Sequence, residues 1–124
     1  MADILLIDDD DLVRSTTRAM LEVGGHQVRE ANSGVTGIDC FQEAIPDLVI
    51  TDIVMPDMDG LETIRALLEI DCNTRILAIS GGGQMLDSTA YLNMATGFGA
   101  RKFLNKPFMK AELLETVSDL LQAH

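Results

Sequence analysis

Cysteines and long apolar stretches are scarce in this sequence. Two cysteines in 124 residues, Cys40 and Cys72, are too few for a disulfide framework, so we expect free thiols in a reducing compartment, the cytoplasm. No stretch approaches the roughly 18 apolar residues of a membrane span, and the apolar run Ile4–Ile7 is too short for a signal peptide. We therefore expect neither a membrane segment nor a secretory signal.

Basic residues are scarce as well. Nine lysines and arginines stand against 20 aspartates and glutamates, which gives a formal net charge of −11. Such a surface repels phosphate backbones and anionic lipids, so we expect no direct binding to nucleic acid or to a membrane. The two histidines, His26 and His124, lie far apart in the chain and lack partners at metal-ligand spacing, so we assign them no role.

The apolar residues form short runs that alternate with longer segments of helical period, a pattern typical of alternating strands and helices. A chain of this length usually folds as one domain, so we expect residues 1–124 to form a single domain without an output domain. The pattern predicts an α/β fold with a five-stranded parallel sheet and helices on both faces. Except for the weaker second run, the strands are expected to be buried on both faces. The predicted strands are Ile4–Ile7, Gln27–Ala31, Leu48–Thr51, Ile76–Ile79 and Lys102–Leu104.

Apolar residues at helical spacing predict a helix after each strand. Ser33 is expected to cap the second helix, and Gly24-Gly25 suits the end of the first. The fourth helix is expected from Ser88 to Thr96. The apolar faces of the other four consist of Val13, Met20 and Leu21; Val35, Ile38 and Ile45; Leu61, Ile64 and Leu68; and Leu113, Val117 and Leu120.

Acidic residues follow the first and third predicted strands, as the run Asp8–Asp11 and as Asp52. Ligands bind at the carboxyl ends of strands in such sheets, and these two strands are usually neighbours, so Asp8 or Asp9 should lie within reach of Asp52. Crowded carboxylates repel one another unless a cation is supplied, and Mg²⁺ suits an all-oxygen ligand set. An alternative for acids in this run is a helix N-terminus, where they complement the dipole; it suits Asp10 and Asp11 better than Asp8 and Asp9.

Two further polar residues follow the fourth and fifth strands. Lys106 is a basic residue at a strand's carboxyl end, suited to a phosphate or carboxylate oxygen, although an exposed loop lysine is the alternative. Ser80 supplies a hydroxyl donor beside glycines, and alone it would be an ordinary turn serine. Together with the acids these residues indicate a phosphoryl-transfer site in which Asp52 is the nucleophile. Mg²⁺ would neutralise the charge on the phosphoryl oxygens, and Ser80 and Lys106 would bind the remaining oxygens.

Four motifs in order give the chain a clear resemblance to the receiver domain of two-component response regulators, over essentially its whole length. They are Ile4–Asp9, Asp52–Gly60, Ser80-Gly81 and Lys106-Pro107-Phe108. The resemblance implies a flavodoxin-like, doubly wound (βα)₅ sheet of strand order 2-1-3-4-5. It also implies that a histidine kinase or histidine phosphotransfer protein donates a phosphoryl group to Asp52, and that the domain catalyses only its own phosphorylation and dephosphorylation.

The resemblance also implies further roles around the site. The backbone carbonyl of Val54 would join Asp8, Asp9 and Asp52 as a metal ligand, and the Lys106–Pro107 bond would be cis. On phosphorylation Ser80 would move toward the phosphate and the aromatic side chain of Phe103 would swing inward, although Phe103 could instead be a permanently buried core residue. The change would be read by a downstream protein, or by the output domain of a longer parent, at the face of the fourth helix, fifth strand and fifth helix, where Tyr91, Met94 and Met109 are candidates.

Two departures from the family pattern concern the loops. Ser80 and Lys106 are separated by 26 positions, about one helical turn more than in the best-known members, so the fourth helix or its leading loop should be longer or displaced. Val54 and Gly82 occupy positions that often hold the attacking water during dephosphorylation. Neither side chain can do so, which predicts a long-lived phosphoryl group.

Two other classes of protein share part of this pattern. A phosphohydrolase of the haloacid dehalogenase type also uses a nucleophilic aspartate and Mg²⁺, but it needs a threonine after its Asp-x-Asp motif, which Asp8-Asp9-Asp10 lacks. A flavodoxin-like electron carrier needs a hydroxyl-rich phosphate loop after the first strand, where this chain has four aspartates that would repel a phosphate.

Overall fold

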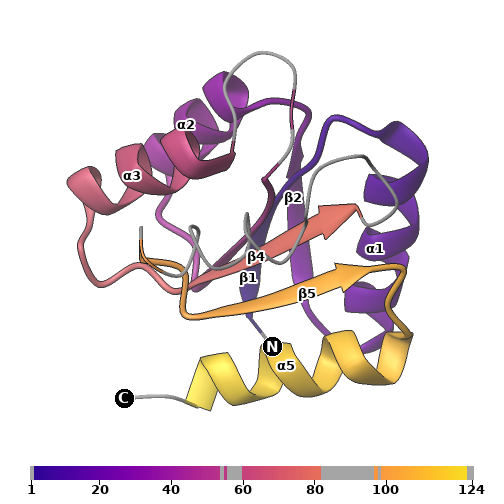
Figure 1. The fold of residues 1–124 in the computed structure, drawn as a ribbon. Helices are drawn as coiled ribbons and strands as arrows, with labels where there is room; N and C mark the ends of the chain where they lie inside the picture. Colours follow the sequence, from indigo (N-terminus) through magenta and orange to yellow (C-terminus); the bar gives the residue numbers. More distant parts are fainter. Residues whose placement is uncertain (1, 54, 56–59, 82–96, 98, 123–124) are drawn as a thin grey trace.

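The computed structural model describes residues 2–53, 55, 60–81, 97 and 99–122, and Figure 1 shows its fold. The predicted fourth helix, Ser88 to Thr96, and the loop before it lie outside these residues. The elements are β1 (Asp3–Ile7), α1 (Asp11–Val23), β2 (Gln27–Ala31), α2 (Gly34–Glu43), β3 (Leu48–Asp52), α3 (Gly60–Ile70), β4 (Ile76–Gly81), β5 (Lys102–Lys106) and α5 (Lys110–Gln122). Strands and helices alternate as expected from β1 to β4, and β5 is followed by α5.

The five strands form one parallel sheet of order β2-β1-β3-β4-β5, which confirms the predicted α/β fold. Helices α2 and α3 pack together on one face, and α1 and α5 cover the other (Figure 1). Alternate side chains of β1 enter the two resulting cores: Leu5 and Ile7 pack under α2 and α3, whereas Ile4 and Leu6 pack under α1 and α5. Burial on both faces explains the continuous apolar run of this strand.

Strand β5 is less buried than predicted. Among the described strands it lies at the edge of the sheet and pairs with β4 alone, and Leu104 is its one buried residue. The prediction of burial on both faces is wrong for this strand, because an edge strand has a sheet neighbour on one side alone. Phe103 is 42% exposed, so the alternative reading of this residue as a permanently buried core phenylalanine is wrong as well.

The N-terminus of α1 settles the role of two acids in the run. Asp10 is the N-cap, and its Oδ1 accepts hydrogen bonds from the backbone N–H groups of Leu12 at 3.0 Å and Val13 at 3.1 Å. Asp11 lies in the first turn, where its charge complements the helix dipole. The helix-terminus alternative is thus confirmed for Asp10 and Asp11, and Asp8 and Asp9 precede the helix. The chain leaves α1 through Gly25, whose φ of 88° favours glycine.

Helix α2 turns a different face to the sheet than its apolar residues predict. Of the three predicted residues, Ile38 packs against the core, Val35 is exposed, and Ile45 is exposed and lies beyond the end of the helix. The buried residues of α2 are Gly34, Gly37 and Phe41. At Gly37 a Cβ atom would lie 2.5 Å from Cδ1 of Ile7, so glycine lets the helix approach β1 more closely than a larger residue would. The predicted cap is confirmed, because Ser33 and Thr36 form a capping box.

Other expectations concern single residues and helix length. Cys40 and Cys72 are free thiols, as predicted. In the part of the chain that the structure describes, no helix is sufficiently long and apolar to cross a membrane.

His26, which the sequence left without a role, follows α1 and supports the start of β1. Its Nδ1 accepts a hydrogen bond from the backbone N–H of Ala2 at 3.3 Å, and burial lowers the pKa of its imidazole. The imidazole of the unfolded chain therefore binds a proton more tightly than that of the folded chain. The contribution of His26 to stability is full above about pH 6.5 and is lost as the pH falls toward the folded-state pKa.

We expect His26→Gln to lose less stability than the wild type between pH 7 and pH 5. Urea unfolding across this range measures the free energy of unfolding of both proteins. An equal fall of this free energy in the variant and the wild type would contradict the expectation.

Candidate functional site

The register of the sheet brings the predicted acids together. Ile7 of β1 pairs with Thr51 of β3, so the next residues, Asp8 and Asp52, lie side by side at the carboxyl edge. Both side chains are almost fully buried, at 0% and 7% exposure, while Asp9 is exposed. One carboxylate oxygen from each of Asp8, Asp9 and Asp52 lies within 4.8 Å of the other two. The predicted cluster of three acids is confirmed.

Lys106 bridges two acids of this cluster. Its Nζ donates to Oδ2 of Asp8 at 2.8 Å and to Oδ2 of Asp52 at 3.0 Å, and only 15% of its side chain is exposed. The alternative of an exposed loop lysine is therefore wrong. Burial on its own would lower the pKa of Lys106, but the hydrogen bond to Asp8 and the charges of Asp52 and Asp8 outweigh it and raise the pKa. The Lys106–Pro107 bond is cis, as the family resemblance implied.

Removing this ammonium should destabilise the fold. In Lys106→Met two buried carboxylates face each other without their cation, and we expect the free energy of unfolding in the absence of metal to fall by about 3 kcal/mol at pH 7. The pKa of Lys106 is raised above 10.5, so its stabilisation is complete below pH 10.5 and is lost as the pH rises through the folded-state pKa. The gap between wild type and variant should thus stay constant up to about pH 10 and narrow above it.

Urea unfolding from pH 7 to pH 11 measures this gap, and Lys102→Met is the matched control. Lys102 lies on the same strand, and its exposed ammonium is 3.4 Å from Asp119. Its loss should cost less than 1 kcal/mol, as for other surface ion pairs, roughly 0–1 kcal/mol. Equal costs for the two substitutions would contradict the buried role of Lys106.

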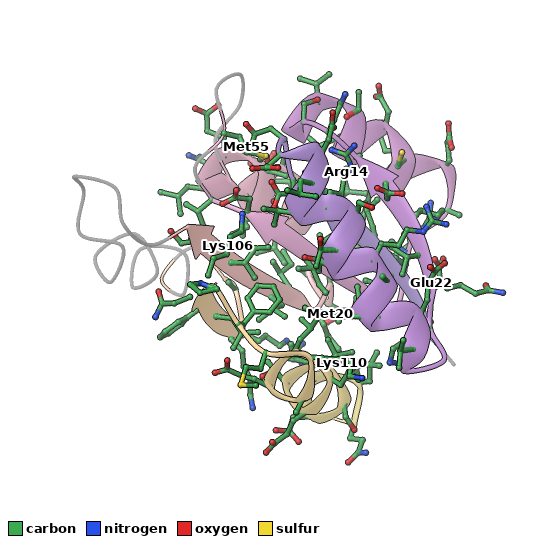
Figure 2. The ribbon with its side chains drawn as sticks, turned by 90° about the vertical axis from the view of Figure 1, so that its right-hand side faces the viewer. Arg14, Met20, Glu22, Met55, Lys106 and Lys110 are labelled. Atoms are coloured by element: carbon green, nitrogen blue, oxygen red, sulfur yellow. The ribbon has the colours of Figure 1, made fainter. Side chains whose placement is uncertain are left out.

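Hydrogen bonds hold both the backbone and the side chain of Asp8. Its N–H donates to the carbonyl of Ala31 at 3.1 Å, and its Oδ1 accepts from the N–H of Asp10 at 2.9 Å. Its carbonyl accepts from Nη1 of Arg14 at 2.7 Å. Figure 2 shows Arg14 on α1, on the side of the molecule that also carries Lys106. Sequence reasoning missed Arg14; the available signal was a basic residue three positions after Asp11, on the same helix face.

Gly60, the first residue of α3, packs directly on the end of β3. A Cβ atom on Gly60 would lie 2.3 Å from the carbonyl oxygen of Asp52 and 2.4 Å from Cα of Ile53, and the Gly60 N–H donates to the carbonyl of Ile53 at 2.6 Å. In the sequence this glycine stands at the end of the motif Asp52–Gly60, with no predicted role. Its structural role is to let α3 begin against the backbone that carries Asp52.

Of the remaining predicted site residues, one lies at the site, two are exposed, and four lie outside the described residues. Ser80 is buried, at 1% exposure, and comes directly after Ile79, which pairs with Asp52. It therefore lies at the same edge of the sheet as the acids. Phe103 and Met109 are exposed. The predicted metal ligand Val54 and the loop and surface candidates Gly82, Tyr91 and Met94 lie outside the described residues.

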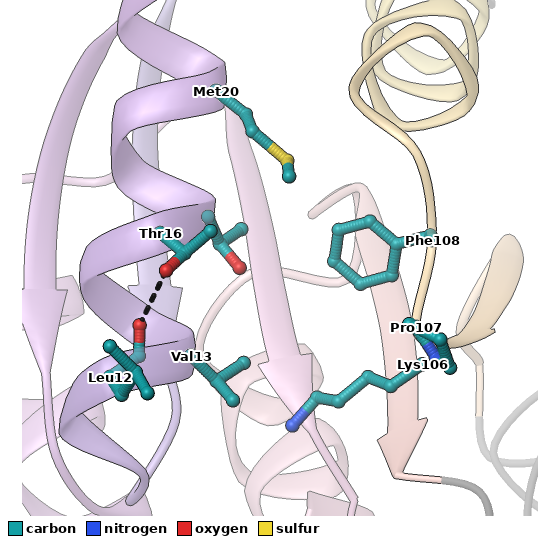
Figure 3. A pocket seen from close by; sticks show the side chains of 8 residues that line it. Leu12, Val13, Thr16, Met20, Lys106, Pro107 and Phe108 are labelled. Carbon is teal, nitrogen blue, oxygen red and sulfur yellow. Dashed lines mark hydrogen bonds between the residues drawn. The ribbon is translucent and has the colours of Figure 1, made fainter.

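An open groove of about 490 Å³ borders the cluster, between α1 and the segment that follows β5 (Figure 3). The aliphatic stem of Lys106 forms part of its wall, so the groove and the acid cluster meet at this residue. Leu12, on its α1 side, is 76% exposed. The lining residues are Leu12, Val13, Thr16, Thr17, Met20, Lys106, Pro107 and Phe108.

Comparison with known proteins identifies the class. Residues 4–118 match the model of the response regulator receiver domain, and the chain belongs to this family. It is 34% identical over 120 residues to the chemotaxis protein CheY of Halobacterium salinarum, a match that covers 97% of each chain. It is 35% identical to the response regulator MprA of Mycobacterium sp. (strain KMS), covering 96% of this chain and 50% of MprA. The receiver domain of NtrX from Brucella abortus superimposes with a TM-score of 0.92 at 26% identity, covering 98% of this chain and 100% of that one.

The family match decides between the functions left open by the sequence. Receiver domains of response regulators are phosphoacceptor switches in two-component signalling, and this chain is such a domain. Strand order 2-1-3-4-5 also occurs in flavodoxins, so the fold alone does not separate a receiver from an electron carrier. The electron carrier and the phosphohydrolase are set aside by the family match together with the acid cluster.

Proposed function

We propose that Asp52 accepts a phosphoryl group from a phosphohistidine of a histidine kinase or phosphotransfer protein. A carboxylate oxygen of Asp52 attacks the phosphorus, the P–N bond breaks, and its electron pair leaves with the donor imidazole, which then takes up a proton. The observation that supports this proposal is the buried Asp52 carboxylate with the Lys106 ammonium 3.0 Å from its Oδ2 and two more acids beside it. The domain acts on its own aspartate and turns over no external substrate.

The donor set of the cluster fits Mg²⁺. Three carboxylates and one ammonium leave the cluster with a net negative formal charge, and hard oxygen ligands are those that Mg²⁺ prefers. Asp8, Asp9 and Asp52 would hold the ion together with the backbone carbonyl of Val54. When bound, it would neutralise charge on the phosphoryl oxygens.

Lys106 and Ser80 would serve the phosphorylated state. The ammonium of Lys106 already contacts Oδ2 of Asp52, so a short movement would bring it to a phosphoryl oxygen, and the Ser80 hydroxyl would bind another. Movement of Ser80 vacates space at the end of β4, into which the exposed ring of Phe103 would swing. A downstream protein, or the output domain of a longer parent, would detect this change at the face formed by the fourth helix, β5 and α5.

The groove beside Lys106 is the surface on which the donor protein would dock. It opens next to the cluster and exposes apolar side chains such as Leu12, and the donor histidine has to reach Asp52 from this open edge. Burial of exposed apolar area would supply affinity without a contact to the reacting atoms.

Intact mass spectrometry of the wild type tests the proposal. Incubation with acetyl phosphate and Mg²⁺ should add about 80 Da, the mass of one phosphoryl group, and chelation of the metal should prevent the gain. A phosphorylated histidine donor protein should give the same product. Absence of a gain with both donors in the presence of Mg²⁺ would overturn the proposed function.

A further inference from the structure

Arg14 joins three parts of the molecule behind the acid cluster. It projects from the first turns of α1 with 15% of its side chain exposed. Its Nη1 donates to the carbonyl of Asp8 at 2.7 Å, its Nε to Glu30 of β2 at 2.9 Å and its Nη2 to Asp11 at 2.7 Å. One planar guanidinium thus binds the end of β1, the edge strand β2 and the start of α1.

The carbonyl contact concerns the peptide that links two predicted metal ligands. The Asp8 carbonyl belongs to the Asp8–Asp9 peptide, and the orientation of this peptide sets the direction in which the Asp9 side chain leaves the backbone. The N–H and the side chain of Asp8 are held by Ala31, Asp10 and Lys106. Arg14 adds the bond that holds the peptide following Asp8, beyond the last pairs of the β1 ladder.

We propose that Arg14 is a positioning residue for the divalent cation: by holding the Asp8 carbonyl it keeps the carboxylates of Asp8 and Asp9 directed toward Asp52. The inference rests on the proposed function, since it concerns the ion that supports phosphorylation. Residues that orient metal ligands typically contribute about 10- to 100-fold to metal affinity. Arg14 acts on the backbone of a ligand instead of its carboxylate, so the lower end of that range is expected.

The test is Mg²⁺ binding to the unphosphorylated protein, measured by isothermal titration calorimetry with Mg²⁺ as the only ligand. Arg14→Gln should bind Mg²⁺ about tenfold more weakly than the wild type. Arg18→Gln is the matched control, because Arg18 lies one turn further along α1 and pairs with Glu30 and Glu22. It loses ion pairs of the same kind on the same helix, and its Mg²⁺ affinity should stay within about twofold of wild type.

Arg14→Lys separates geometry from charge. Lysine keeps the positive charge but replaces the planar fork by a single ammonium, so its Mg²⁺ affinity should lie nearer to Arg14→Gln than to the wild type. Mg²⁺ at a fixed concentration should also raise the thermal unfolding midpoint of each protein. We expect this rise to be largest in the wild type, smaller in Arg14→Lys and smallest in Arg14→Gln. This readout is independent of how stable each variant is without metal.

Three results would overturn the inference while leaving the proposed function intact. The first is a Mg²⁺ affinity of Arg14→Gln equal to that of the wild type, and the second is a loss of about tenfold in Mg²⁺ affinity in Arg18→Gln as well. The third is wild-type Mg²⁺ affinity in Arg14→Lys, which would show that the charge alone matters. Failure of the wild type itself to bind Mg²⁺ would instead overturn the proposed function, and the role of Arg14 with it.

Discussion

Asp52→Asn is expected to gain no phosphoryl group from acetyl phosphate, with or without Mg²⁺. Asparagine keeps the size of the side chain, but its neutral amide is a poor nucleophile, so the acyl phosphate cannot form. Intact mass after incubation should therefore stay at the unmodified value, while the wild type gains about 80 Da. The substitution also removes one of the three carboxylates of the cluster, so Mg²⁺ affinity should fall in the same variant.

Asp39→Asn is the matched control for this experiment. Asp39 lies on α2, outside the acid cluster, and the same chemical change there should leave the mass gain as in the wild type. Thermal unfolding of both variants would establish that each is folded. A gain of about 80 Da on Asp52→Asn, with phosphate mapped to another residue, would disprove the assignment of Asp52 as the acceptor.

Gly60→Ala is expected to damage both the fold and the site. The added methyl group would lie 2.3 Å from the carbonyl oxygen of Asp52 and 2.4 Å from Cα of Ile53. Both are backbone atoms, so no side-chain rotation can relieve the overlap, and either the start of α3 or the end of β3 has to move. We expect the free energy of unfolding to fall by about 3 kcal/mol, at the upper end of the usual cost of overpacking.

The shift of β3 should also displace Asp52. A misplacement of about 1 Å in a reacting group can lower a rate by about 100-fold, so phosphorylation of folded Gly60→Ala by acetyl phosphate should slow by a similar factor. Gly97→Ala is the control, since a Cβ atom at Gly97 would meet no atom of the described residues within 4 Å. Urea unfolding and the time course of the mass gain measure the two effects. Wild-type stability in Gly60→Ala would contradict the close approach of α3 to β3.

The arrangement of the sheet was predictable because strands that are buried on both faces consist almost entirely of apolar residues. Ile4–Ile7 and Leu48–Thr51 are continuous apolar runs because helices cover both faces of the central strands. The acids that follow them were predictable as a cluster for a related reason: parallel neighbouring strands end at the same edge, which brings Asp8 and Asp52 together.

Predictions failed where the packing depends on size or position and not on hydrophobicity. The buried face of α2 is formed by Gly34, Gly37 and Phe41, with Ile38 packed against the same core. Counting apolar residues identified Ile38 but also favoured Val35 and Ile45, which are exposed. A glycine carries no apolar signal, yet it permits the closest contact with the sheet. The burial of β5 was overestimated because its composition does not reveal that it pairs on one side only.

The charged residues of the site could be predicted from the sequence, whereas the residues that position them could not. Asp8, Asp9, Asp52 and Lys106 could be named from the printed chain, because charged side chains at strand ends are costly to place near one another without a function. The roles of Arg14 and Gly60 could not be assigned in the same way, because arginines and glycines near the start of a helix are common in any sequence. Their roles depend on a 2.7 Å bond to the Asp8 carbonyl and on contact with the Asp52 backbone, distances that exist only once strands and helices far apart in the chain are packed together.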